Sequence, residues 1–102
     1  MPESSTEAAR LLGSRLRDER LRLGSSQDEV ANLAGMNVSN YGKIERGIGN
    51  PVLVTIVRLA VVLGIDPAVL VAGLGAEHLP ADQRPFTVAE FVSERAKRQR
   101  QH

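Results

Sequence analysis

The sequence predicts an all-α fold of five short helices followed by a further helix near the C-terminus. Three observations support this prediction. Apolar residues recur every three or four positions, residues that cap helix N-termini precede these segments, and glycines follow them. No element length or turn pattern indicates a sheet. The 102 residues are 42% hydrophobic and 25% charged, the proportions of one ordinary globular domain.

The composition excludes several kinds of site. The chain has no cysteine, which excludes disulfides, zinc fingers, iron–sulfur clusters and thiol catalysis. Its two histidines, His78 and His102, are far apart, and we expect His78 to be exposed rather than a metal ligand. We therefore predict no metal and no cofactor. No apolar run reaches the roughly 20 residues of a membrane helix, and there is no signal-peptide pattern, so we expect a cytoplasmic protein that contacts no membrane.

The first helix is predicted from about residue 6 to residue 23. Leu12, Leu16 and Leu23 fall at helical spacing, with charged residues on the other faces. Gly24 is the kind of residue that follows a helix end. The leucines are therefore expected to face a core.

Two more helices are predicted on either side of a glycine turn. Ser26 and Glu29 have the spacing of a capping box, and Gly35 ends that helix because glycine tolerates a positive φ. Asn37 then caps a third helix, from about residue 38 to 46. The inner faces are expected to meet in an aliphatic core: Leu16, Leu23, Val30, Leu33, Ile44, Leu59 and Leu63. Two short helices joined in this way are a helix-turn-helix arrangement.

The fourth helix is predicted over residues 52–63, although its β-branched residues alone would favour a strand. Its apolar residues keep a helical rhythm: Leu53, Ile56, Leu59, Ala60 and Leu63. Pro51 is expected in the first turn. Asp66, followed by Pro67, opens a fifth short helix that ends near Ala72.

A final helix is predicted from about residue 88 to 97. Thr87 and Glu90 have capping-box spacing, and Phe86 and Phe91 have the positions of a hydrophobic staple. The apolar face of this helix is expected to pack on the fourth helix of its own chain, to be exchanged across a dimer, or to bind a different protein.

The stretch from Leu12 to Leu74 resembles the lambda-repressor-like (Cro/repressor, XRE-type) helix-turn-helix family. The resemblance lies in Arg15-Leu16-Arg17, Arg20, Ser26-Gln27, Val30-Ala31, Ala34-Gly35, Ser39, Ile44-Glu45-Arg46-Gly47, Pro51, Leu59-Ala60 and Leu63-Gly64. It implies a five-helix DNA-binding domain, and the C-terminal helix, which lies outside the resemblance, is predicted from its own residues. The predicted division is a flexible lead at residues 1–7, the helix-turn-helix domain at 8–75, a linker at 76–85, and a C-terminal helix with a basic tail at 86–102.

The resemblance implies that the third helix enters the major groove of double-stranded DNA. The DNA-binding residues that it implies are Gln27, Asn37, Val38, Ser39, Asn40, Lys43, Arg46 and Asn50. Lys43 could donate to guanine, Val38 could pack on a thymine methyl, and Gln27 could face a phosphate. It also implies a salt bridge between Arg20 and Glu45. Few of these side chains are long, so we expect DNA shape to contribute to recognition.

The fourth helix is apolar nearly all round, which indicates burial on more than one side. We therefore expect a homodimer, which would place two recognition helices roughly 34 Å apart. The predicted interface residues are Val52, Val54, Val57, Val61, Pro67, Ala68 and Val71.

The expected function is a homodimeric, sequence-specific transcriptional regulator, a repressor on a palindromic operator. An alternative is an antitoxin-type protein that neutralises a partner through its C-terminal segment, and a third is a controller of a restriction system. The net charge of +1 does not by itself point to a nucleic-acid partner. The prediction of DNA binding therefore depends on the local residue pattern. We expect no enzyme, because no catalytic arrangement is suggested and Gly73-Leu74-Gly75 lacks the strand and helix of a nucleotide site.

Overall fold

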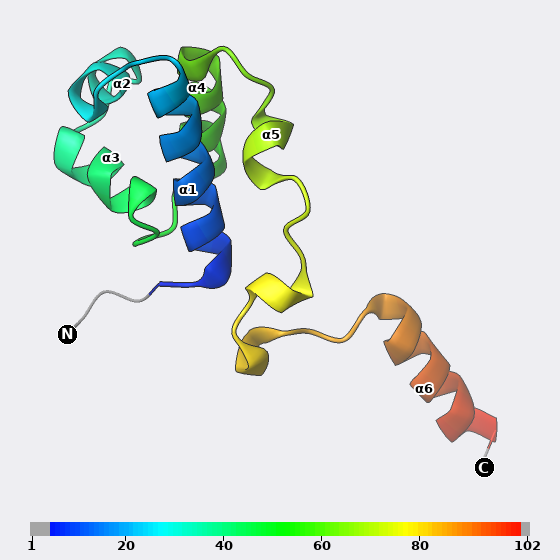
Figure 1. Ribbon diagram of the computed structural model, residues 1–102. Helices are drawn as coiled ribbons and strands as arrows, with labels where there is room; N and C mark the ends of the chain where they lie inside the picture. Colours follow the sequence, from blue (N-terminus) through cyan, green and yellow to red (C-terminus); the bar gives the residue numbers. More distant parts are fainter. Residues whose placement is uncertain (1–4, 101–102) are drawn as a thin grey trace.

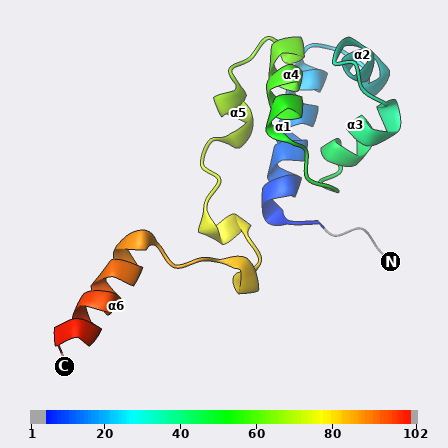
Figure 2. The same ribbon diagram turned by 180° about the vertical axis from the view of Figure 1, so that it is seen from behind.

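Helices α1 to α5 form a bundle in which α1 runs through the middle (Figure 1). The computed structural model describes residues 5–100. The bounds are Glu7–Arg22 for α1, Gln27–Leu33 for α2, Val38–Glu45 for α3, Leu53–Leu63 for α4 and Pro67–Val71 for α5. Helix α1 packs against α3 and α5, while α2 lies against α3 and α4. Seen from behind, α5 lies on the side of the bundle away from α3, and α4 overlaps α1 between them (Figure 2).

The chain after α5 leaves the bundle. Two short 3₁₀ turns, Ala76–His78 and Ala81–Gln83, lead to α6 (Val88–Arg100). Both views show α6 apart from the other helices (Figures 1 and 2). The all-α prediction is therefore confirmed for the described residues. None of their helices is long and apolar enough to cross a membrane.

Local capping places the helix boundaries close to where the sequence predicted them. The Glu29 amide donates to Ser26 Oγ at 3.1 Å and the Ser26 amide donates to Glu29 Oε1 at 2.8 Å, so the predicted capping box is present. Asn37 Oδ1 accepts from the amides of Ser39 and Asn40. Gly35 has a φ of 68°, as the turn required. These bonds satisfy amides that a helix end leaves without intrahelical partners.

Two helix ends differ from the prediction. Pro51 lies outside α4, because Val52 is the N-cap residue with extended backbone and α4 begins at Leu53. Helix α6 continues to Arg100, since no glycine or proline follows residue 97 to end it.

At the start of α6 the Glu90 amide donates to Thr87 Oγ1, and the Thr87 hydroxyl donates to Glu90 Oε1. The Glu90 carboxylate thus binds the Thr87 side chain rather than its amide, and the predicted capping box is only half formed.

The core is aliphatic around one aromatic ring. Its buried hydrophobic residues are Leu12, Leu16, Val30, Ala31, Ala34, Tyr41, Ile44, Leu59, Ala60, Leu63 and Leu70. Leu23 and Leu33 were predicted here and are instead 50% and 74% exposed. Leu23 lies beyond the last turn of α1 as its C-cap. Leu33 lies outside the buried face of α2, which Val30 and Ala31 form. Tyr41 and Leu70, both fully buried, occupy the core instead.

Helices α1 and α3 approach each other closely at Gly13. A Cβ at this residue would lie 2.4 Å from the carbonyl oxygens of Ile44 and Glu45. Gly13 therefore lets the end of α3 rest directly against α1. This contact fixes the position of the helix that the sequence assigns to DNA.

Candidate nucleic-acid interface

Helix α3 has a buried face and an exposed edge. Tyr41, Gly42, Ile44 and Glu45 are buried and hold the helix to the bundle. Of the predicted DNA-binding residues, those on the outer edge are Asn37, Ser39, Asn40 and Arg46, all exposed, with Lys43 half-buried. Asn50 is exposed in the connection to α4. The structure thus brings the predicted residues of α3 together along one edge.

Val38 lies partly inside this edge. It is half-buried and packs against the hydrophobic core. Much of its side chain therefore serves the attachment of α3. Only the remaining surface of Val38 can contact a base, which is less of the side chain than the predicted contact with a thymine methyl assumed.

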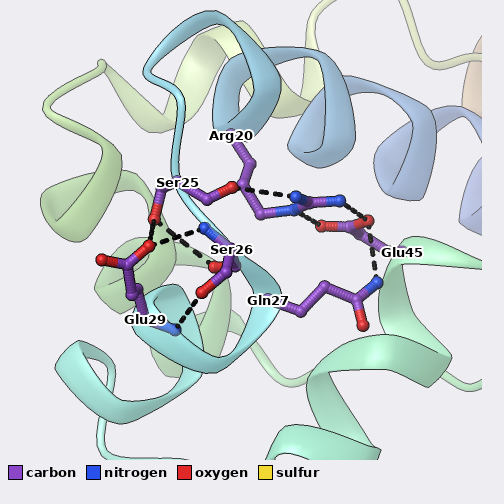
Figure 3. A network of polar contacts seen from close by, with 6 residues as sticks. All are labelled: Arg20, Ser25, Ser26, Gln27, Glu29 and Glu45. Carbon is purple, nitrogen blue, oxygen red and sulfur yellow. Dashed lines mark hydrogen bonds and ion pairs between the residues drawn. The ribbon is translucent and has the colours of Figure 1, made fainter.

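A polar network joins α1, α2 and α3 beneath the exposed edge (Figure 3). Arg20 Nε lies 2.6 Å from Glu45 Oε2, and its Nη2 donates to Glu45 Oε1 at 3.0 Å. The Arg20 Nη1 donates to the Ser25 carbonyl at 2.9 Å, and Gln27 Nε2 donates to Glu45 Oε1 at 3.1 Å. The structure therefore contains the Arg20–Glu45 pair that the sequence predicted, in a bidentate geometry that fixes both planes.

Burial and pairing act in opposite directions on Glu45. Burial alone raises the pKa of the Glu45 carboxyl, but the hydrogen bonds from Arg20 and Gln27 outweigh it and hold that pKa below its ordinary value. The hydrogen bond to Glu45 raises the pKa of Arg20. The side chains of Arg20 and Glu45 are only 11% and 3% exposed. The pair is therefore charged, nearly buried and structural.

Tyr41 lies fully buried beside this network. Its hydroxyl has no hydrogen-bond partner among the described residues, and burial raises the pKa of the phenol. The ring is the largest fully buried side chain of the described core. Tyr41 therefore anchors α3 through packing rather than through a hydrogen bond.

Gln27 has a second role besides the predicted phosphate contact. One N–H of its amide binds Glu45, and its Oε1 lies 3.5 Å from where a Cβ of Gly42 would be. Gly42 is buried in α3 beside these side chains, and Arg46 Nη1 lies 3.3 Å from where a Cβ of Gly42 would be.

A polar pocket of about 250 Å³ opens beside the exposed edge of α3. It is lined by Arg17, Arg20, Gln27, Glu45 and Arg46. Within residues 5–100 neither Arg17 nor Arg46 makes a hydrogen bond or ion pair with another side chain. Sequence reasoning missed Arg17, because its place opposite Arg46 depends on how α1 crosses α3. Two guanidinium groups without protein partners at the mouth of this pocket suit an anion such as a DNA phosphate.

The predicted dimer residues lie on α4 and α5, which pack against each other. Val52, Val54 and Val61 are more than 60% exposed, and Val57 and Val71 are each 40% exposed. Ala68 is exposed and Pro67 is half-buried. Leu53 and Val69, which the sequence did not assign to this surface, are also exposed. We call these nine residues, which are Val52 at the N-cap of α4 and eight residues of α4 and α5, the valine face.

Known proteins resemble the chain over the helix-turn-helix part. A family of helix-turn-helix domains matches residues 11–72. The Sinorhizobium fredii (strain NBRC 101917 / NGR234) protein "Uncharacterized HTH-type transcriptional regulator y4dJ" is 32% identical over 77 residues, covering 76% of this chain and 91% of that protein. The Bacillus subtilis (strain 168) protein "SPbeta prophage-derived uncharacterized HTH-type transcriptional regulator YonR" is 34% identical over 67 residues, covering 66% of this chain. The match spans 62% of that regulator's length, less than two thirds of it.

A solved structure supports the same assignment. The restriction-modification controller protein C.AhdI from Aeromonas hydrophila is 42% identical and superposes with a TM-score of 0.60, covering 61% of this chain and 94% of that one. These relatives are regulators and not enzymes. The chain therefore belongs to the lambda-repressor-like (XRE-type) helix-turn-helix family of transcriptional regulators.

Proposed function

We propose that this protein is a sequence-specific DNA-binding repressor that acts as a homodimer on a palindromic operator. The observation that carries the proposal is the exposed polar edge of α3, held rigidly by the Arg20–Glu45 pair and buried Tyr41. A rigid edge of this kind can enter a major groove without first being ordered. Because DNA-binding regulators act where the DNA lies, the proposal includes a cytoplasmic location.

The proposed contacts divide into base and phosphate contacts. Ser39, Asn40 and Lys43, with the open part of Val38, would read base edges from the middle of the exposed edge. The residues around them would contact phosphates and set the orientation on the duplex: Gln27, Asn37, Arg46 and Asn50.

The valine face supports the homodimer. Its exposed valines lie on two helices that pack against each other, and monomeric proteins seldom leave a large apolar patch in water. Helices α4 and α5 carry one charged residue between them, Arg58. A twofold pairing of identical valine faces would bury apolar area while leaving both α3 edges open. Such a dimer suits two half-sites of an operator.

Selection of bound fragments from random duplex DNA at a stated salt concentration tests the proposal. We expect one enriched motif with two inverted half-sites about one helical turn apart. Ser39→Glu should abolish the enrichment, because it places a negative charge on the exposed edge of α3. Ala81→Glu is the matched control, since residue 81 is exposed in the 3₁₀ turn outside the bundle. Enrichment of no motif, or equal enrichment with Ser39→Glu, would contradict the proposal.

Two observations favour more specialised settings for the same domain. The 42% identity to C.AhdI favours a controller of a restriction system, which would act through the same α3 edge. The exposed apolar residues of α6 favour an antitoxin-type protein. Co-purification of a second polypeptide that depends on residues 76–102 would support the antitoxin. A stable dimer that binds its operator alone would support the regulator.

A further inference from the structure

Helix α6 carries an apolar surface that nothing in the described chain covers. None of its residues is buried, and the exposed fractions are 82% for Phe86, 78% for Val88, 61% for Phe91 and 41% for Val92. The helix has 13 residues, and isolated helices of this length are marginal in water. Helix α6 therefore needs a packing partner.

The surface of α6 contains a groove with ordered charges. Phe86 and one side of α6 line an open groove of about 830 Å³, and the lining includes Phe91, Glu90, Glu94, Arg95 and Arg98. Along the helix the two acidic residues come first and the two arginines follow. The Arg95 guanidinium lies 5.8 Å from the centre of the Phe91 ring, so the charges border the apolar patch directly. The groove is thus negative at one end and positive at the other.

We propose that α6 pairs antiparallel with α6 of a second copy of this chain. In that orientation the acidic half of each helix faces the basic half of the other, with the pair centred between Glu94 and Arg95. Glu94 then lies level with Arg95 of the second copy, and Glu90 lies within one residue of the level of its Arg98. Parallel pairing would instead set acid against acid and arginine against arginine, which is destabilising. The sequence of charges along the groove therefore selects both the occupant and its direction.

The valine face of the same chain is a poorer partner for α6. Its helices α4 and α5 contain no acidic residue, and Arg58 is their one charge. Docking there would bring Arg95 and Arg98 to a surface that offers no carboxylate and one like charge. A second α6 offers both the phenylalanines and the matching carboxylates.

A single pair of short helices buries little area, so the contact is weak when the copies are otherwise separate. If the valine faces hold two chains together, a tethered α6 reaches an effective concentration near the millimolar range. The pairing rests on the proposed homodimer for its strength, but it uses none of the residues of the α3 edge. The α6 pairing and DNA recognition by α3 can therefore fail independently.

Disulfide trapping tests the direction of pairing, since the chain has no cysteine of its own. Full-length Glu90→Cys and Arg98→Cys proteins, one of them with a size tag, are unfolded, mixed, refolded together and oxidised. In the antiparallel pair, residues 90 and 98 of different copies are neighbours, whereas the two copies of residue 90 are about 14 Å apart along the axis and the two copies of residue 98 about 10 Å. Because a disulfide needs Cα atoms within about 7 Å, we expect roughly tenfold more mixed dimer than either homodimer.

Asn32→Cys, exposed on α2, is the control for cross-linking by random collision. Homodimers that outnumber the mixed dimer would overturn the antiparallel direction. If the α6 variants cross-link no faster than Asn32→Cys, the α6 pairing is overturned. This is also the result expected if α6 binds a different protein. Circular dichroism of each variant shows whether the bundle is folded. Selection of duplex DNA by the same variants shows separately whether the proposed regulator function holds.

Charge exchange gives a second, independent measurement. Glu90→Arg with Glu94→Arg makes the groove wholly basic, and Arg95→Glu with Arg98→Glu makes it wholly acidic. Self-association in sedimentation velocity should weaken for each variant alone and recover in an equimolar mixture. Unchanged association of the single variants would overturn the charge pairing.

Discussion

Arg20 on α1 and Glu45 at the end of α3 form a bidentate ion pair that is almost closed to water, with Nε and Oε2 2.6 Å apart. The same carboxylate accepts a hydrogen bond from Gln27 on α2. One buried charge thus holds three helices in a fixed relation directly beneath the edge proposed to read DNA.

Arg20→Ala should lower the free energy of unfolding by about 3 kcal/mol, because it leaves Glu45 buried without its partner. Arg22→Ala is the matched control, since its pair with Glu19 leaves the Arg22 side chain 58% exposed and such pairs contribute about 1 kcal/mol or less. Urea denaturation measures both values. Equal losses for the two variants would show that the Arg20–Glu45 pair adds nothing beyond a surface contact.

The depressed pKa of Glu45 predicts a stability change in acid. The folded protein holds this carboxylate deprotonated more strongly than the unfolded chain does, so the contribution is fully present above the ordinary pKa of 4.5 and is lost as pH falls through the lower folded pKa. The stability difference between the wild type and Glu45→Gln should therefore shrink as pH drops below about 4.5. Urea titrations from pH 7 to pH 3 measure this difference. Because both proteins contain the other carboxylates, their contributions to the unfolding free energy cancel in the subtraction. A difference that stays constant over this range would contradict the assignment.

Substitutions of Lys43 and Arg46 are expected to change DNA binding in different ways. Lys43→Ala should relax base preference at one position in each half-site, by about 1–3 kcal/mol of discrimination. Arg46→Ala should weaken binding to every duplex and reduce the slope of log affinity against log salt by about 0.9 for each phosphate that Arg46 neutralises. Titration of matched and single-mismatch operators at several salt concentrations separates the two. A uniform loss with Lys43→Ala would make Lys43 a phosphate-binding residue instead.

Val57→Asp tests the valine face. Burying an unpaired carboxylate between two chains should raise the dimer dissociation constant at least roughly thirtyfold, or about 2 kcal/mol. Leu33→Asp is the matched control, because Leu33 is 74% exposed on α2 outside the valine face. Sedimentation equilibrium gives both constants. Similar effects of the two substitutions would exclude the valine face as the interface.

The local sequence determined the helices and most of their ends. Ser26, Asn37 and Asp66 cap helices through bonds to amides two or three residues away, and Gly35 supplies a positive φ that its own residue type permits. The resemblance to the helix-turn-helix family could also be recognised from the sequence, because the family's motif is a set of residue types at fixed spacings along the chain. The residues of α3 that the resemblance assigned to DNA lie along one exposed edge, except that Val38 is half-buried.

Only the tertiary structure decided what each face meets. Leu33 is an apolar residue of the type found in protein cores, but it lies on the exposed face of α2. Tyr41 is fully buried in the core. Gly13 proves to be a point of close approach, and Arg17 joins the polar pocket, because α1 and α3 cross where they do. Burial and pairing between helices depend on distances that no stretch of sequence fixes by itself, whereas caps and turns are closed by atoms a few residues apart.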